Sequence, residues 1–67
     1  MILIQNWNEW YKAVSEVKKW QKGEARLSRK GKTARRFMRN MGLCHENNVS
    51  KVASETWKQY KLMFGIS

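Results

Sequence analysis

The chain has 67 residues, 42% of them apolar, and its 14 Lys and Arg residues against five Glu residues give a net charge of +9. A single cysteine excludes an internal disulfide, and no segment contains the ~20 consecutive apolar residues that a membrane span needs. The eight aromatic residues are far more than a disordered basic tail contains. We therefore expect one small folded domain over residues 1–67. We also expect no signal peptide, and a reducing cytoplasm, that of a bacterial cell, as its location.

The first expected helix covers residues 7–22. Its apolar residues recur at steps of three and four, which is helical spacing: Trp7, Trp10, Tyr11, Val14 and Val17. Asn6 is a suitable N-cap, and Glu9 stands where a capping box places its carboxylate. Gly23 is placed to end the helix. Trp20 falls outside the apolar stripe, next to three lysines of the last turn, Lys18, Lys19 and Lys22.

The second expected helix has two alternative starts, giving residues 25–41 or 33–41. Thr33 can cap the shorter version, whereas the longer one runs through Gly31 at a cost of about 1 kcal/mol. The segregation of side chains favours the longer version. Leu27, Ala34, Phe37, Met38 and Met41 share one face of it, and five basic residues share the opposite face.

The third expected helix covers residues 49–64, with Asn48 as N-cap and Gly65 as its end. Leu62 lies opposite its apolar stripe. Three amphipathic helices joined by short connections predict an all-α fold, a small three-helix bundle. The expected core comprises Trp7, Trp10, Tyr11, Val14, Val17, Phe37, Met38, Met41, Val49, Val52, Trp57, Tyr60 and Phe64.

The second and third helices have an apolar pattern similar to that of a helix-turn-helix. Their connection is one or two residues longer than the tight turn of that motif. The arginines also precede the helix that would read bases. This order favours contacts with a nucleic-acid backbone, or an arginine-rich helix in RNA, over base reading. The helix-turn-helix stays as an alternative.

Catalytic chemistry has little support in the sequence. Cys44, His45 and Glu46 are adjacent, but nucleophilic catalysis needs such groups to converge in space, which neighbours in sequence rarely do. No second His or Cys completes a zinc site. The tripeptide "GKT" lacks the preceding glycine of a phosphate-binding loop. We expect no enzyme activity, no metal and no cofactor.

The charge is concentrated in one third of the chain. Ten basic residues and one acid lie between Lys18 and Arg39, which accounts for the entire net charge. Such a patch indicates a polyanionic partner, and arginine binds phosphate in a bidentate manner. A charged face that serves solubility alone would more often mix both signs. The expected nucleic-acid-binding residues are Arg26, Arg29, Lys30, Lys32, Arg35, Arg36 and Arg39, with Lys18, Lys19 and Lys22 at the rim.

Two further function classes stay open beside DNA or RNA binding. The chain can be a protein-binding modulator whose basic face docks on an acidic surface, for example of a host enzyme that handles nucleic acid, with Trp20 or Leu62 as anchor. Exposed apolar area beside the basic face would favour this alternative. Membrane activity is disfavoured by the mean hydropathy of −0.76.

The role of Trp20, the oligomeric state and the origin of the chain also have several interpretations. Trp20 can stack on a base, contact a protein or a membrane interface, or simply be a partly buried residue at the core edge. A homodimer would bury more of the aromatic residues. Docking onto phosphates suggests a regulatory or architectural role, and small size alone suggests a protein of a bacteriophage or mobile element.

Overall fold

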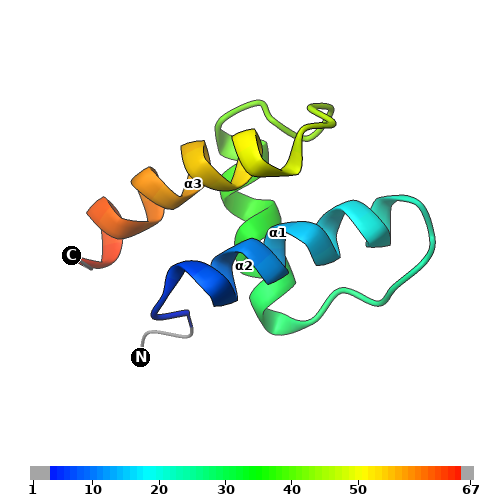
Figure 1. Cartoon of the computed structure of the whole chain (residues 1–67), viewed down its shortest axis with the longest axis horizontal. Coiled ribbons are helices and arrows are strands. Elements are labelled where there is room, and N and C mark those ends of the chain that lie inside the picture. The colour runs from blue at the N-terminus through cyan, green and yellow to red at the C-terminus, as the bar shows by residue number, and fades with distance from the viewer. Residues whose placement is uncertain (1–3, 66–67) are drawn as a thin grey trace.

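The computed structural model describes residues 4–65, which form three helices: α1 (Trp7–Gln21), α2 (Arg29–Asn40) and α3 (Val49–Phe64). Figure 1 shows α1 and α3 in front, with α2 crossing behind both of them. The described part of the chain contains no strand. This arrangement confirms the all-α three-helix bundle.

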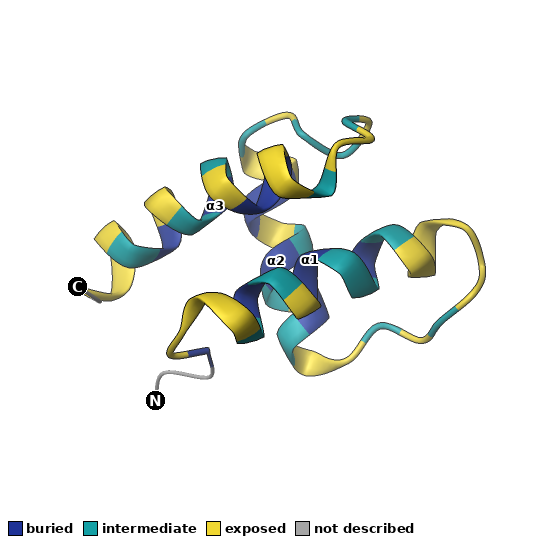
Figure 2. Cartoon of the chain, viewed as in Figure 1, coloured by how far each residue is buried: buried dark blue, intermediate teal, exposed yellow. Residues whose placement is uncertain are grey.

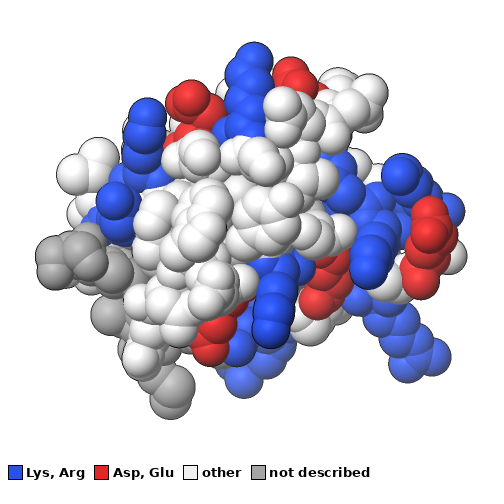
Figure 3. Space-filling view, viewed as in Figure 1, with Lys and Arg blue, Asp and Glu red and all other residues white. Residues whose placement is uncertain are grey.

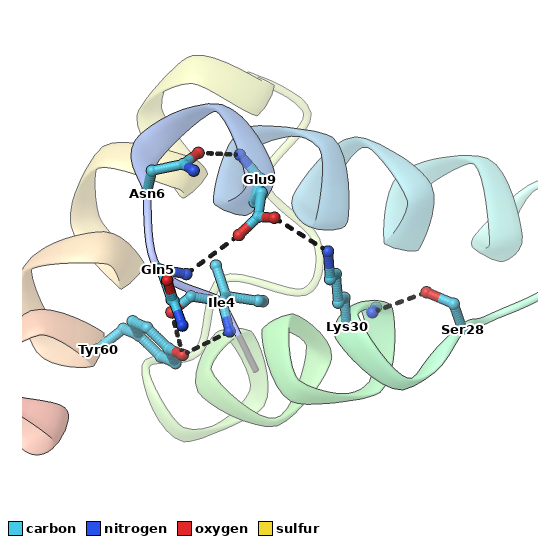
Figure 4. Close-up of polar contacts among 8 residues, drawn as sticks. Ile4, Gln5, Asn6, Glu9, Ser28, Lys30 and Tyr60 are labelled. Carbon is cyan, nitrogen blue, oxygen red and sulfur yellow. Dashed lines mark hydrogen bonds and ion pairs between the residues drawn. The ribbon is translucent and has the colours of Figure 1, made fainter. Parts of the chain in front are cut away.

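The start of α1 is held by a cluster of polar contacts. Asn6 accepts a hydrogen bond from the backbone N–H of Glu9 at 2.9 Å. The Glu9 carboxylate accepts from the backbone N–H of Gln5 at 3.1 Å and from the Lys30 ammonium at 3.2 Å (Figure 4). The capping box therefore closes on the residue before the N-cap, and α1 begins at the expected residue.

The start of α2 differs from both expected versions, because the N-cap is Ser28. Its hydroxyl oxygen accepts from the backbone N–H of Gly31 at 3.2 Å. The hydroxyl also donates to the Glu16 carboxylate at 3.0 Å, and the backbone N–H of Ser28 donates to the same carboxylate. Glu16 belongs to α1, so this cap is completed from another helix. Thr33 instead lies inside α2 and donates to the carbonyl of Arg29.

Gly31 marks the place where α2 crosses α1. A Cβ atom at this residue would lie 2.6 Å from the Oε1 atom of Glu16 and 2.9 Å from the Cδ1 atom of Leu27. Both distances are shorter than van der Waals contact, and both atoms end flexible side chains, so a larger side chain at residue 31 would first displace Glu16 and Leu27. The glycine that weakens α2 as an isolated helix thus leaves room for the side chains of Glu16 and Leu27.

The core lies where the three helices meet (Figure 2). The Trp10 ring lies 5.7 Å from the Phe37 ring and 4.6 Å from the Tyr60 ring, measured between centroids. The indole N–H of Trp10 donates to the fully buried hydroxyl of Thr56 at 3.0 Å. The buried apolar residues are Ile4, Trp10, Ala13, Val14, Val17, Ala34, Phe37, Met38, Val52, Ala53 and Tyr60.

Tyr60 also fixes the segment that precedes α1. Its hydroxyl accepts from the backbone N–H of Ile4 at 3.1 Å and donates to the Ile4 carbonyl at 2.6 Å (Figure 4). Ile4 is fully buried and belongs to the core, whereas Gln5 and Asn6 after it are exposed. The expected core did not include Ile4.

The core prediction was wrong at the outer ends of two helices. Trp7 is 38% exposed and Phe64 is 41% exposed, because the first turn of α1 and the last turn of α3 extend past the crossing helix. Met41 is half-buried at the end of α2. Tyr11, Val49 and Trp57 are partly buried and pack against the core.

The connection between α2 and α3 has eight residues, 41–48. A helix-turn-helix joins its two helices by a turn of about three or four residues. The tight turn that defines the motif is therefore missing between α2 and α3.

Candidate nucleic-acid interface

The basic residues of α2 lie opposite its buried face. Ala34, Phe37 and Met38 are buried against the other helices, with Gly31 at the crossing. Because a helix repeats every 3.6 residues, the residues between them point outward. Five basic residues occupy this outer side, and we refer to them as the cationic face: Arg29, Lys32, Arg35, Arg36 and Arg39. Arg35 is half-buried and the other four are exposed.

A shallow pocket lies on the cationic face. It is lined by Lys32, Arg35, Arg36, Arg39 and Asn40, and none of these side chains is acidic. Four cations around one depression fit the oxygen atoms of a phosphate group. Sequence reasoning missed Asn40 because it is uncharged. Its position one turn after Arg36 was the signal that could have found it.

The cationic face lowers the stability of its own helix. Arg29 and Lys32 lie in or beside the first turn, where the helix dipole favours anions. Lys32 and Arg36, like Arg35 and Arg39, are four residues apart, and like charges at this spacing repel each other. Within residues 4–65 no ion pair offsets these charges, since the two pairs present there involve Lys30 and Lys51.

Two expected binding residues have contacts within the fold. Lys30 pairs with Glu9 at 3.2 Å, and its side chain points toward α1 (Figure 4). The hydrogen bond from Gln5, together with that of Lys30, holds the pKa of the Glu9 carboxyl below its ordinary value of 4.5. Lys18 donates to the carbonyl oxygen of Cys44 at 2.9 Å and so holds the 41–48 connection. The structure places neither ammonium group on the cationic face.

The remaining expected residues lie where α1 ends. Lys19 is in its last turn, Lys22 is its C-cap, and Arg26 lies in the connection to α2; all three are exposed. Figure 3 shows Lys and Arg side chains gathered at this side of the molecule, whereas uncharged side chains fill the middle of the face formed by α1 and α3.

Trp20 connects this basic end of α1 with the cationic face. The guanidinium carbon of Arg35 lies 4.8 Å from the centroid of the Trp20 ring, in a cation–π contact. Trp20 is nevertheless 36% exposed. Its ring therefore lies at the surface between two sets of cations.

Apolar side chains are exposed at the far end of α3. Leu62 is 79% exposed, as its position opposite the apolar stripe predicted, and Met63 is 69% exposed. Met63 and Phe64 share a shallow pocket with Arg36 and Asn40 of α2. This apolar end of α3 thus adjoins the cationic face.

The segment Cys44-His45-Glu46 lies in the 41–48 connection. Cys44 is half-buried, and the Glu46 carboxylate accepts from the backbone N–H of Asn48 and pairs with Lys51 at 3.9 Å. Residues 4–65 contain no group of three His, Cys, Asp or Glu side chains that could hold a metal ion. Among the helices described, none has the length and apolar character needed to cross a membrane.

Comparisons with protein families, with curated proteins and with solved structures found no match to this chain.

Proposed function

We propose that this chain is a non-enzymatic nucleic-acid-binding protein that contacts phosphates with the cationic face of α2. The observation that carries the proposal is the acid-free pocket lined by Lys32, Arg35, Arg36, Arg39 and Asn40. Arginine guanidinium groups donate pairs of parallel hydrogen bonds to phosphate oxygens. A small domain with such a face suits a regulatory or architectural role.

The unfavourable electrostatics of α2 support the proposal. The cationic face combines like charges one turn apart with cations at the positive end of the helix dipole. A bound polyanion would remove both penalties, and its condensed counterions would be released. A solubility surface would gain nothing from this arrangement, because mixed charges keep a protein soluble without these penalties.

The proposal is tested by fluorescence anisotropy with labelled duplex DNA, single-stranded DNA and hairpin RNA in a salt series. If about six phosphates are contacted, affinity falls about 10³-fold between 50 and 200 mM salt. Arg36→Gln/Arg39→Gln should weaken binding and lower the slope of log K against log salt by about two.

The matched control is Lys12→Gln/Lys58→Gln. These lysines are exposed on α1 and α3, and their removal changes the net charge by the same amount. The control should bind nearly as the wild type does. Equal losses in both double variants, or wild-type binding no tighter than about 10⁻⁴ M at physiological salt, would contradict the proposal.

A second candidate function, a protein-binding modulator, is favoured by the apolar end of α3. Met63 is exposed beside Arg36, and Leu62 is exposed on the same helix turn, so an apolar anchor lies next to positive charge, which suits an acidic protein surface. A partner identified by cross-linking would be purified and its affinity measured by calorimetry. Under this function, Leu62→Ser/Met63→Gln and Arg36→Gln/Arg39→Gln both lose the partner. Under the first function, Leu62→Ser/Met63→Gln binds nucleic acid as the wild type does.

A further inference from the structure

Trp20 is placed differently from the other tryptophans of the chain. Trp10 is fully buried, and Trp57 is partly buried against the core. Trp7 is as exposed as Trp20, at 38% against 36%, but it packs against the aromatic rings of Tyr11 and Trp57. Trp20 has a guanidinium group over its ring instead. It is therefore the exposed indole that belongs to the basic surface.

Arg35 joins the Trp20 ring to the pocket on the cationic face. Its guanidinium carbon lies 4.8 Å from the ring centroid, and the same side chain lines the pocket with Lys32, Arg36 and Arg39. Among the described residues Arg35 makes no ion pair. A guanidinium group has five N–H donors, so contact with an aromatic ring leaves donors for a phosphate. Arg35 can thus hold an anion while it contacts the indole.

An indole beside a cationic pocket matches the two parts of a nucleotide. The phosphate carries the negative charge, and the base offers a flat π-surface that stacks on an aromatic ring. In a duplex the faces of the bases are covered by their neighbours, so only an unpaired nucleotide can present its base to Trp20. Proteins that bind single strands commonly combine a basic groove with such aromatic platforms.

We propose that Trp20, Arg35 and the pocket on the cationic face form a binding site for an unpaired nucleotide. Its base stacks against the exposed part of Trp20, and its phosphate is bound by Arg35 together with Arg36 and Arg39. This inference rests on the proposed nucleic-acid binding and specifies its ligand as a single strand or an unpaired loop. The rest of the cationic face would contact neighbouring phosphates without regard to sequence.

The test uses three ligands that share one phosphate backbone chemistry. They are a labelled single-stranded DNA 12-mer, the same 12-mer annealed to its complement, and an abasic 12-mer that lacks every base. The wild-type chain should bind the ordinary single strand most tightly. Trp20→Leu should weaken that binding about 5- to 150-fold, since stacking on one base contributes about 1–3 kcal/mol. The same variant should leave duplex and abasic binding nearly unchanged.

Trp7→Leu is the matched control, because it removes an equally exposed tryptophan from the other end of α1. It should bind all three ligands as the wild type does. Trp20→Phe keeps an aromatic ring and should fall between the wild type and Trp20→Leu. Should Trp20→Leu fail to fold by circular dichroism, Trp20→Phe gives the comparison instead.

A second measurement leaves Trp20 in place. In a Trp7→Phe background, quenching of tryptophan fluorescence by acrylamide reports mainly on Trp20. The single strand should reduce this quenching, and the abasic strand should not.

The outcomes separate the two proposals. If the wild type binds none of the three ligands and no hairpin RNA either, the proposed nucleic-acid binding itself falls. If the wild type binds the ordinary and abasic single strands equally well, or if Trp20→Leu weakens all three ligands alike, only the unpaired-nucleotide site is overturned. Selective loss of the ordinary single strand supports the site.

Discussion

The two faces of α2 differ although they alternate along the same twelve residues. The inner face carries Ala34, Phe37 and Met38, which are buried in the hydrophobic core. The outer face repeats positive charge at Lys32, Arg36 and Arg39 with no carboxylate lining the pocket between them. Packing explains the inner face, whereas the like charges one turn apart on the outer face repel each other. The buried residues of α2 are therefore explained by folding, whereas its exposed basic residues need another explanation.

The largest expected effect is that of Trp10→Ala, because Trp10 of α1 packs against the inner face of α2. This substitution removes a ring that packs against Phe37 and Tyr60 and leaves the Thr56 hydroxyl without its donor. Replacing a buried tryptophan costs about 3–5 kcal/mol. A 67-residue domain has only about 3–10 kcal/mol of stability in total. We expect a chain that is largely unfolded by circular dichroism at 25 °C.

Trp7→Ala is the comparison for that variant, because its tryptophan is exposed. It should retain the helical spectrum and a cooperative melting transition. A Trp10→Ala chain that melts as the wild type does would contradict the role of the aromatic core.

The crossing of α1 and α2 is tested next by Gly31→Leu. The new side chain would overlap Glu16 and Leu27 and would displace the carboxylate that holds Ser28. Overpacking of this kind costs about 1–3 kcal/mol. Urea denaturation should show the loss as a lower midpoint. The Cβ of Gly31→Ala meets only the flexible ends of these two side chains, so this variant should change stability less. Equal stability of Gly31→Leu and the wild type would exclude a close crossing.

Substitutions on the outer face should leave the unfolding free energy nearly unchanged, in contrast to those in the core and at the crossing. Arg36→Gln/Arg39→Gln removes repelling charges and no buried contact, so we expect a change in unfolding free energy within about 0.5 kcal/mol. Any gain at low salt should disappear at high salt, because salt screens the repulsion. Urea denaturation at two salt concentrations measures this. A clear loss of stability would show that these arginines serve the fold and would remove the contrast between the faces.

The smallest expected effect concerns Glu9, which pairs with Lys30 at the boundary between the two faces. Its folded-state pKa is lowered, so ionised Glu9 stabilises the fold above the unfolded pKa, and this contribution is lost as the pH falls through the folded pKa. Glu9→Gln should melt slightly below the wild type at pH 7. The difference should shrink as the pH falls below about 4. A constant difference from pH 7 to pH 3 would exclude the ionised Glu9 carboxylate, with its contacts to Gln5 and Lys30, as the cause.

Sequence reasoning succeeded where the determinants of structure are local. The bounds of α3 were predicted correctly, because its N-cap Asn48 and its terminal Gly65 are adjacent to it. The start of α2 was not predicted, because Ser28 acts as N-cap together with a carboxylate twelve residues earlier in the chain. Likewise, an apolar stripe indicates which side of a helix is buried. It does not indicate where the partner helix ends, which is why Phe64 was wrongly assigned to the core.

The candidate site could be predicted only as a set of charges. Helical periodicity placed Lys32, Arg36 and Arg39 on one face, and it also indicated that Leu62 points outward. The contact of Trp20 with Arg35 depends on how α1 and α2 cross, which no pattern within either helix specifies. The same crossing turns Lys30 toward Glu9 and away from the cationic face.

The pair of hydrogen bonds between Tyr60 and Ile4 has a consequence for the motions of the chain. They join residues separated by 56 positions, and the Ile4 amide is fully buried. Chain segments near an end usually exchange their amide protons quickly through local fraying. The Ile4 amide can exchange with solvent only after it separates from α3. Its exchange rate should therefore match that of the slowest amides of α1, and Tyr60→Phe should accelerate it selectively.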